Sequence, residues 1–226
     1  MIKSLINLFF PKVCSACRTL LMSNEVVFCT SCRHEMPLTQ YYLDPKNEAA
    51  KKFYGRVDAV HVSALLYFNK RGIVQELIHN LKYKGHEEIG SVLGSWQAEE
   101  LKELQLEIPF DAVIPVPLHK RKLRERGYNQ VSTFGKIIAS ELNIPFSEKI
   151  LIRKVYSKTQ SKKNLIGRTE NIENIFDTVF TETDHHKHYL LVDDVLTTGA
   201  TLEACSRALL KIPGAKISIV CMAMAH

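Results

Sequence analysis

Apolar positions along the chain repeat with two different periods, in alternating blocks. Residues 57–68 are rich in Val, Ala, Leu, Tyr and Phe in loose alternation, which predicts a strand or a pair of strands. Five aliphatic residues then recur at helical spacing between positions 73 and 81, and the basic residues and glycine of 82–85 suit the end of a helix. Residues 89–104 predict a second helix, with a less regular apolar stripe.

The same alternation continues along the rest of the chain. A buried strand over 111–118 is followed by a basic loop over 120–130 and a helix over 131–142. The remaining pattern predicts strands at 150–155, 175–180, 189–192 and 217–222, a helix at 200–210, and polar connections at 41–55, 157–168 and 184–188. Strands that alternate with helices predict an α/β fold, in which helices cover both faces of a parallel sheet.

Length and composition agree with this globular fold. The chain has 226 residues, 46% of them hydrophobic and 24% charged, which suits one full domain with a small appendage and excludes a disordered tail or a fibrous repeat. No run of about 18 apolar residues occurs, so no membrane-spanning segment is predicted. The apolar patch within 1–10 lacks the small-residue cleavage site of a signal peptide. We interpret it as a packing or docking segment of a cytoplasmic protein.

Four of the six cysteines form two Cys-x2-Cys knuckles that are separated by eleven residues: Cys14, Cys17, Cys29 and Cys32. This spacing can present four thiolates to one tetrahedral ion, and four sulfur ligands would leave no open position for catalysis. Disulfides are the alternative, but a reducing cytosol disfavours them. The sequence therefore predicts a structural zinc site. Cys205 and Cys221 lie alone in apolar patterns and are expected to be small buried hydrophobic residues.

The net charge of +6 is unevenly distributed. Residues 111–168 contain 13 Lys or Arg against four Asp or Glu, so the rest of the chain is mildly acidic. A basic zone of this kind favours an anionic ligand such as phosphate or nucleic acid, and a solvated surface is the plainer alternative.

The segment 190–201, LLVDDVLTTGAT, has the most informative pattern. A buried strand runs to Asp193 and Asp194, a short loop with Gly199 follows, and a helix begins near Thr201. The N–H groups at a helix N-terminus bind phosphate, and glycine lets the backbone approach it closely. Two carboxylates just before such a loop can accept hydrogen bonds from sugar hydroxyls or hold Mg²⁺. Together these features describe a site for a ribose 5-phosphate.

This segment closely resembles the phosphoribosyltransferase signature that binds 5-phosphoribosyl-1-pyrophosphate (PRPP). The resemblance implies a type I phosphoribosyltransferase-like fold, with Asp193 and Asp194 on the ribose hydroxyls and Mg²⁺. It implies a 5′-phosphate site made of Thr197, Thr198, Gly199, Ala200 and Thr201. In purine salvage enzymes of the hypoxanthine type, an Asp that contacts the base stands where this chain has Thr197. The resemblance therefore supports PRPP binding more than it supports any particular nucleobase.

A narrower resemblance covers nearly the whole chain. The paired knuckles, the segments PVPLH and RERGYNQ within 115–130, Gln160 and Arg168, and VDDVLTTGAT together resemble the ComF/ComFC family. The resemblance implies a role in natural competence, with single-stranded DNA and a ComFA-type helicase as partners. The residues expected to bind pyrophosphate or another anion are His119, Lys120, Arg121, Arg124 and Arg126, since arginine matches phosphate oxygens with a bidentate fork. Tyr128 could stack on a base, or pack at the start of a helix.

Two hypotheses follow, on a chain divided into a zinc-binding knuckle module (1–40) and a phosphoribosyltransferase-like domain (41–226). The favoured one is a protein that binds Mg-PRPP and acts in DNA uptake through single-stranded DNA binding. The alternative is an active phosphoribosyltransferase that transfers the phosphoribosyl group to an acceptor, releases pyrophosphate and has no DNA role. In that case catalysis would be mostly electrostatic, with arginines on the pyrophosphate and acids on the ribose.

Overall fold

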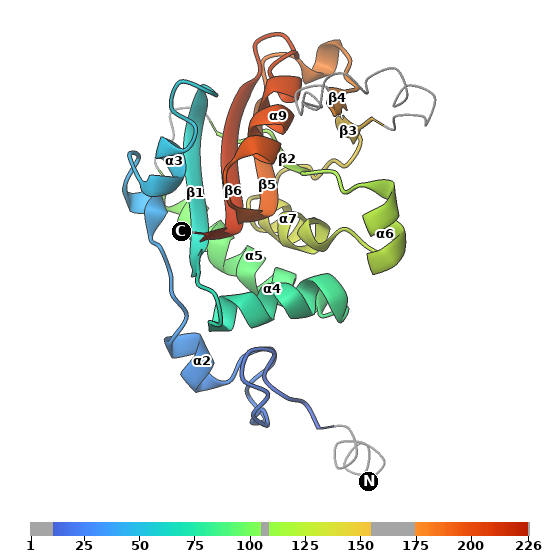
Figure 1. Ribbon diagram of the computed structural model, residues 1–226. Helices are drawn as coiled ribbons and strands as arrows, with labels where there is room; N and C mark the ends of the chain where they lie inside the picture. Colours follow the sequence, from blue (N-terminus) through green and yellow to red (C-terminus); the bar gives the residue numbers. More distant parts are fainter. Residues whose placement is uncertain (1–10, 105–108, 155–174, 226) are drawn as a thin grey trace, which may run out of the picture.

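A four-stranded parallel sheet forms the centre of the computed structural model, which describes residues 11–104, 109–154 and 175–225. Its strands lie in the order β1 (Ala59–Phe68), β6 (Lys216–Ala225), β5 (His188–Leu196) and β2 (Ala112–Pro115), as Figure 1 shows. All three strand pairings are parallel. The predicted parallel sheet is confirmed.

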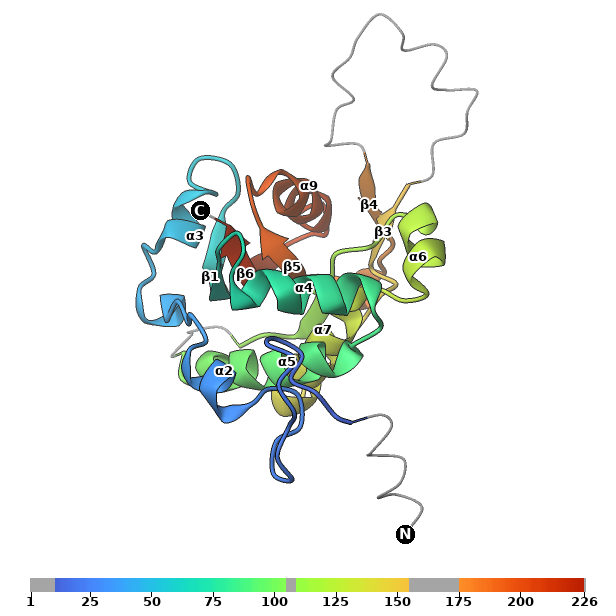
Figure 2. The ribbon, with the colours of Figure 1, turned by 60° about the horizontal axis from the view of Figure 1, so that its bottom comes forward.

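Helices cover both faces of the sheet. Figures 1 and 2 place α4 (Ile73–Tyr83), α5 (Glu87–Lys102) and α7 (Gln130–Glu141) on one face, and α3 (Glu48–Lys51) and α9 (Ala200–Leu209) on the other. α5 and α7 approach closely at Gly94, where a Cβ would lie 2.8 Å from the carbonyl oxygen of Phe134. Only glycine allows this contact, so the less regular stripe of α5 reflects helix–helix packing.

A second, two-stranded antiparallel sheet lies beside α9. Its strands, β3 (Leu151–Arg153) and β4 (Phe176–Thr178), fall inside the predicted strands at 150–155 and 175–180. Leu151 and Phe176 are buried in the same apolar cluster as α9. The predicted basic loop at 157–168, with Gln160 and Arg168, lies outside the described residues.

The segment 41–55 differs from its prediction as a linker. It contains the 3-10 helix η1 (Tyr41–Leu43) and the short helix α3, which packs near β1. Asn47 is buried there, and its side chain is satisfied by hydrogen bonds: it caps α3 at the N–H of Ala50 and donates one of 2.8 Å to the carbonyl oxygen of Val62. Phe53 is only 1% exposed. Asn47 is therefore a structural hydrogen-bonding group of this segment.

The basic segment 120–130 also differs, because it begins with a helix, α6 (Lys120–Arg126), where a loop was predicted. His119 caps it, with Nδ1 accepting a hydrogen bond from the N–H of Arg121. Arg121 and Glu125 form an i,i+4 ion pair of 2.7 Å, and Gly127 ends the helix with a φ of 79°. None of the seven residues of α6 is buried, so no apolar stripe announces this helix in the sequence.

The cysteine knuckles pack against the same face of the fold as α4 and α5. Val27, Phe28 and Met36 belong to the buried cluster that includes Leu77 and Leu81 of α4. The side chain of Asn80 donates a hydrogen bond of 2.7 Å to the carbonyl oxygen of Ser15. The division of the chain at residues 40 and 41 stays a prediction.

The helix α2 (Thr30–His34) belongs to the knuckle region and begins directly after Cys29. None of the described helices combines the length and the apolar character that a membrane crossing requires.

Candidate functional site

The two neighbouring acids lie within β5, which extends beyond the predicted end at residue 192 to Leu196. Successive side chains of a strand point to opposite faces. Asp194 faces α4 and α7, where its Oδ2 accepts hydrogen bonds from Gln130 Nε2 at 2.7 Å and pairs with Lys82 Nζ at 2.9 Å. Asp193 lies on the opposite face, and its Oδ1 accepts a hydrogen bond from the N–H of Asp194. The acid pair is therefore held by protein groups from three elements.

Burial strongly affects the charge of Asp193. Desolvation, together with the carboxylate of Asp194, raises the pKa of Asp193 to about 8, and the charges of Lys82 and Lys122 oppose this rise. Burial and the neighbouring carboxylate therefore disfavour the ionised form of Asp193. A bound cation or a further hydrogen-bond donor would stabilise the ionised form.

The loop after β5 turns directly into α9. Thr197, Thr198 and Thr201 are exposed, whereas Gly199 is buried and has a φ of 80°. A Cβ at Gly199 would lie 3.2 Å from Cζ of Phe53, so both the backbone conformation and the close packing require glycine. The first N–H groups of α9 have no partners within the helix, and the helix dipole favours an anion at this end. The local geometry suits a phosphate group.

A side chain from far away in the sequence braces this loop. The guanidinium of Arg56 donates hydrogen bonds to the carbonyl oxygen of Thr198 at 3.1 Å and, through Nε, to Glu203 of α9 at 2.7 Å. A second contact joins Arg56 Nη2 to the same Glu203 oxygen. Phe53 and Arg56 were missed by the sequence analysis, because a single Arg at the end of a polar segment gives no signal of a partner 147 residues away.

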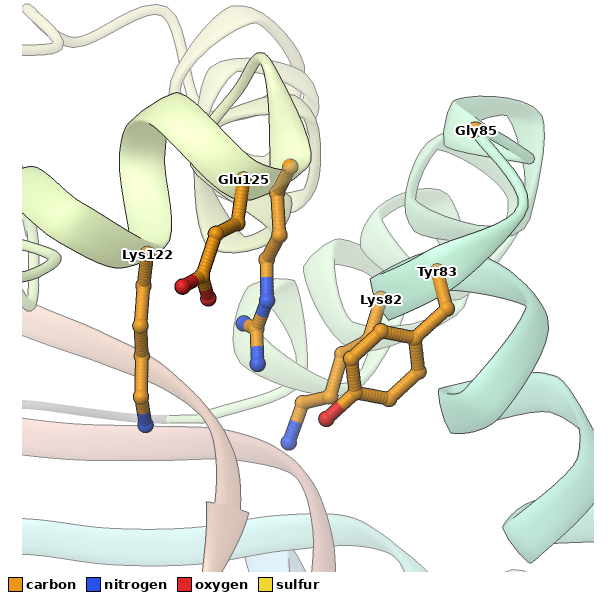
Figure 3. Close-up of a pocket in the computed structure, with 6 residues that line it drawn as sticks. Lys82, Tyr83, Gly85, Lys122 and Glu125 are labelled. Carbon is orange, nitrogen blue, oxygen red and sulfur yellow. The ribbon is translucent and has the colours of Figure 1, made fainter.

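A basic pocket of about 240 Å³ lies between the last turn of α4 and the helix α6. In Figure 3 the side chains of Lys122 and Lys82 extend into it from opposite sides. The guanidinium of Arg126 lies over the ring of Tyr83, 5.2 Å from its centroid. The pocket is lined by Lys82, Tyr83, Gly85, Lys122, Glu125 and Arg126. Three cations against one acid give it a positive potential beside the acid pair.

The structure disperses the anion-binding residues that the sequence predicts on this helix. Arg126 lines the pocket, but His119 caps α6 and Arg121 pairs with Glu125. Lys120 and Arg124 are exposed on α6 and do not line the pocket. Lys82 and Lys122 line the pocket but are not among the predicted site residues, although both belong to basic segments of the sequence.

Tyr128 and Asn129 connect α6 to α7. The hydroxyl of Tyr128 donates a hydrogen bond to the carbonyl oxygen of Leu81 in α4. Asn129 caps α7 and donates a hydrogen bond of 3.1 Å to the carbonyl oxygen of Val116. Of the two alternatives for Tyr128, packing at the start of a helix describes its place in the structure.

The four knuckle cysteines come together as the spacing predicts. The sulfur atoms of Cys14, Cys17, Cys29 and Cys32 all lie within 4.8 Å of one another. The Sγ of Cys14 accepts hydrogen bonds from the N–H groups of Ala16 and Cys29, as expected for a thiolate in a metal site. A hydrogen bond with Thr19 lowers the pKa of Cys17 to about 6, and burial raises the pKa of Cys32. This cluster could hold one tetrahedral ion.

Comparison with known proteins places these features in a family. The model of the phosphoribosyl transferase domain matches residues 132–226. The chain is 30% identical over 213 residues to "Competence protein ComFC" of Bacillus subtilis (strain 168), which covers 85% of this chain and 81% of that protein. The chain belongs to the ComF/ComFC family. It is also 34% identical over 116 residues to "Competence protein F" of Haemophilus influenzae, covering 51% of this chain.

Other matches of this ComF-family chain are shorter or more distant. It is 29% identical over 150 residues to "DNA utilization protein YhgH" of Escherichia coli O157:H7, which is 65% of each chain. The matches span 50% of the Haemophilus protein and 65% of YhgH. An adenine phosphoribosyltransferase crystal structure matches with 14% identity and a TM-score of 0.39, over 68% of this chain and 75% of that chain.

The predicted fold class is confirmed: a type I phosphoribosyltransferase fold with a parallel sheet between helices, and a cluster of four cysteines in its N-terminal part.

Proposed function

We propose that this ComF-family chain binds Mg-PRPP at the carboxyl end of β5 and takes part in natural competence through single-stranded DNA binding. One observation supports the first part: the half-buried Asp193 and the buried Asp194 lead into a glycine turn that Phe53 and Arg56 hold against the start of α9. In this proposal the loop 197–201 binds the 5-phosphate, and Asp193 and Asp194 bind the ribose hydroxyls.

The residues at this end of β5 fit a magnesium ion. Mg²⁺ is commonly held by one or two carboxylates, several waters and the phosphates of a substrate. The carboxylates of Asp193 and Asp194 supply such oxygens at the same strand end. When bound, the ion would neutralise phosphate charge. The four thiolates of the knuckle fit Zn²⁺ in a closed, structural site.

The DNA part of the proposal rests on charge and on relatives. The relatives are named for competence and for DNA utilization. The helix α6 exposes four Lys or Arg side chains to solvent, and they lie next to the basic pocket. Such a surface attracts the phosphates of a single strand without reading its sequence. A cytoplasmic location and a ComFA-type helicase as a partner complete the proposal.

Isothermal calorimetry with PRPP and Mg²⁺ tests the sugar-phosphate site. We expect Mg²⁺-dependent binding to the wild-type chain and none to Asp194→Ala. The matched control is Asp177→Ala, because Asp177 lies on β4, pairs with Lys154 and Lys211, and is outside the proposed site. Equal affinity of the Asp194→Ala and wild-type chains would overturn the assignment.

A further inference from the structure

The geometry points to Lys82 as an exchangeable cation of the sugar-phosphate site. In the free protein its ammonium neutralises Asp194; when Mg²⁺ and a diphosphate ester bind, the metal replaces it there and the ammonium moves to the diphosphate. This inference deepens the proposed function and rests on it. Through Lys82, the helix α4, against which the cysteine knuckles pack, would contact the ligand directly.

The ion pair itself is short and largely shielded from water. Lys82 Nζ lies 2.9 Å from Oδ2 of Asp194, and the two side chains are 20% and 11% exposed. Removing one partner of such a pair would leave an uncompensated charge. Asp194 therefore needs a cation, in the free protein as well as in the complex. Among the described residues, Lys82 is the one that forms an ion pair with it.

The hydrogen bonding around Asp194 is incomplete without a ligand. Gln130 is 3% exposed and donates its Nε2 hydrogen to the same Oδ2 that Lys82 contacts. Its Oε1 is buried and accepts no hydrogen bond from the described part of the chain. A buried acceptor without a donor is costly, and a sugar hydroxyl or a metal-bound water beside Asp194 could supply the donor. The unpaired Oε1 of Gln130 therefore indicates a ligand position beside Asp194.

Lys82 also lines the basic pocket between α4 and α6, so its ammonium can reach either Asp194 or this pocket. Lys122 lies across that pocket (Figure 3), Arg126 also lines it, and Glu125 is its one acid. A diphosphate placed there would face three cations, since the ammonium of Lys82 would be free once a metal ion occupied Asp194. The exchange leaves no charge unpaired: Asp194 trades the ammonium of Lys82 for the metal ion, and the diphosphate gains that ammonium.

The backbone around Lys82 is anchored, so the exchange needs only rotation of its side chain. Asn80 donates a hydrogen bond to the carbonyl oxygen of Ser15, and the carbonyl oxygen of Leu81 accepts one from Tyr128. These contacts tie the last turn of α4 to the first knuckle and to the start of α7. The side chain of Lys82 has four rotatable bonds between this fixed backbone and its charge.

The exchange is tested with three separate probes on the full chain: Mg-pyrophosphate and ribose 5-phosphate by calorimetry, and Mn²⁺ alone by electron paramagnetic resonance. For Lys82→Met we expect pyrophosphate affinity to fall about tenfold to a hundredfold and ribose 5-phosphate affinity to stay within about threefold. Mn²⁺ affinity should rise, because the competing ammonium is gone. Lys84→Met is the matched control, since Lys84 contacts Glu76 outside the pocket and should leave all three values unchanged.

Several outcomes would overturn the exchange. They are an unchanged pyrophosphate affinity in Lys82→Met, equal losses for pyrophosphate and ribose 5-phosphate, or Mn²⁺ binding that does not strengthen. Lys82→Gln keeps a long polar side chain without the charge, and it serves as the test if Lys82→Met fails to fold. A wild-type chain that binds neither ribose 5-phosphate nor Mg-PRPP would instead defeat the proposed function, whereas tight wild-type binding with an indifferent Lys82 defeats only the exchange.

Discussion

The carboxyl ends of β5 and β2 carry the two halves of the proposed site, and they are built in opposite ways. After β5 the turn is buried at Gly199 and fixed by Phe53 and Arg56 from a distant segment. After β2 the chain forms α6, which has no buried residue and is held by its caps and by the Tyr128 hydroxyl beyond it. The end of β5 is a turn fixed by packing and hydrogen bonds, whereas the end of β2 leads into a charged helix on the surface.

The difference matches what each end would recognise. A sugar phosphate has a fixed shape, and a preformed loop binds it without ordering cost. The phosphates of a diphosphate or a single strand act mainly through charge, which works over several ångströms and tolerates a less rigid arrangement. Substitutions at the β5 end should therefore act through geometry, and those at the β2 end should act through charge.

Two glycines with the same backbone conformation give the sharpest test of this comparison. Gly199 has a φ of 80° and Gly127 a φ of 79°, but a Cβ meets Phe53 at Gly199 and meets nothing within 4 Å at Gly127. We expect Gly199→Ala to weaken ribose 5-phosphate binding about thirtyfold, or about 2 kcal/mol. Gly127→Ala should change this affinity by less than about twofold, at a similar cost in backbone strain. Calorimetry measures both, and equal effects would remove the contrast.

The charge of α6 should appear in the salt dependence of DNA binding. Each lost phosphate contact lowers the slope of log K against log salt by about 0.7 for a single strand. We expect Arg124→Ala with Arg126→Ala to lower that slope by about 1.4 and to weaken binding at low salt about tenfold. Fluorescence anisotropy with labelled oligonucleotides at several salt concentrations checks this.

Arg207→Ala is the control for that titration, since Arg207 is a cation on α9 that pairs with Glu203. A flat salt response in the wild-type chain would count against DNA binding at this surface.

The free energy of unfolding should depend on pH through the carboxyl group of Asp193. The pKa of Asp193 is raised to about 8, whereas an unfolded Asp has a pKa near 4, so its unfavourable effect on folding grows as pH rises from about 4 to 8. We expect Asp193→Asn to stabilise the free chain at pH 8, by an amount that shrinks as the pH falls, and to change its stability by almost nothing at pH 4. Urea unfolding at the two pH values measures this.

The matching substitution at Asp177 should change the stability in the opposite direction. The neighbouring Lys154 lowers the pKa of Asp177, so this carboxylate stabilises the fold above its unfolded pKa and loses that effect as pH falls. Asp177→Asn should therefore destabilise the chain slightly at neutral pH. Stabilisation by Asp177→Asn, or destabilisation by Asp193→Asn at pH 8, would contradict the assigned electrostatics.

The smallest expected effect concerns the brace of the phosphate loop. Glu203→Gln keeps a hydrogen-bond acceptor for Arg56 but removes the charge, and Arg56 keeps its bond to Thr198. We expect ribose 5-phosphate affinity to fall about twofold to fivefold, with DNA binding unchanged. Glu99→Gln on α5 is the control, since Glu99 pairs with Lys102 at the surface. A loss as large as that of Gly199→Ala would mean that the brace, and not the turn, determines the site.

Much of the fold could be predicted from periodicity, because its strands and main helices bury one face or both. The helices α3 and α6 were missed for physical reasons: α3 is four residues long, and α6 buries nothing. The acids and the threonine loop could be found because they are contiguous in sequence. Lys82 pairs with Asp194, 112 positions away, and Arg56 pairs with Glu203, 147 positions away. Such pairings arise only when the chain folds.

A crystal structure of the full chain soaked with PRPP and Mg²⁺ would show directly whether the carboxyl end of β5 binds the sugar phosphate. We expect the 5-phosphate against the backbone N–H groups of 198–201, the ribose hydroxyls at Asp193 and Asp194, and the diphosphate between α4 and α6. Ligand density elsewhere on the molecule, with the loop 197–201 empty at saturating PRPP, would contradict it.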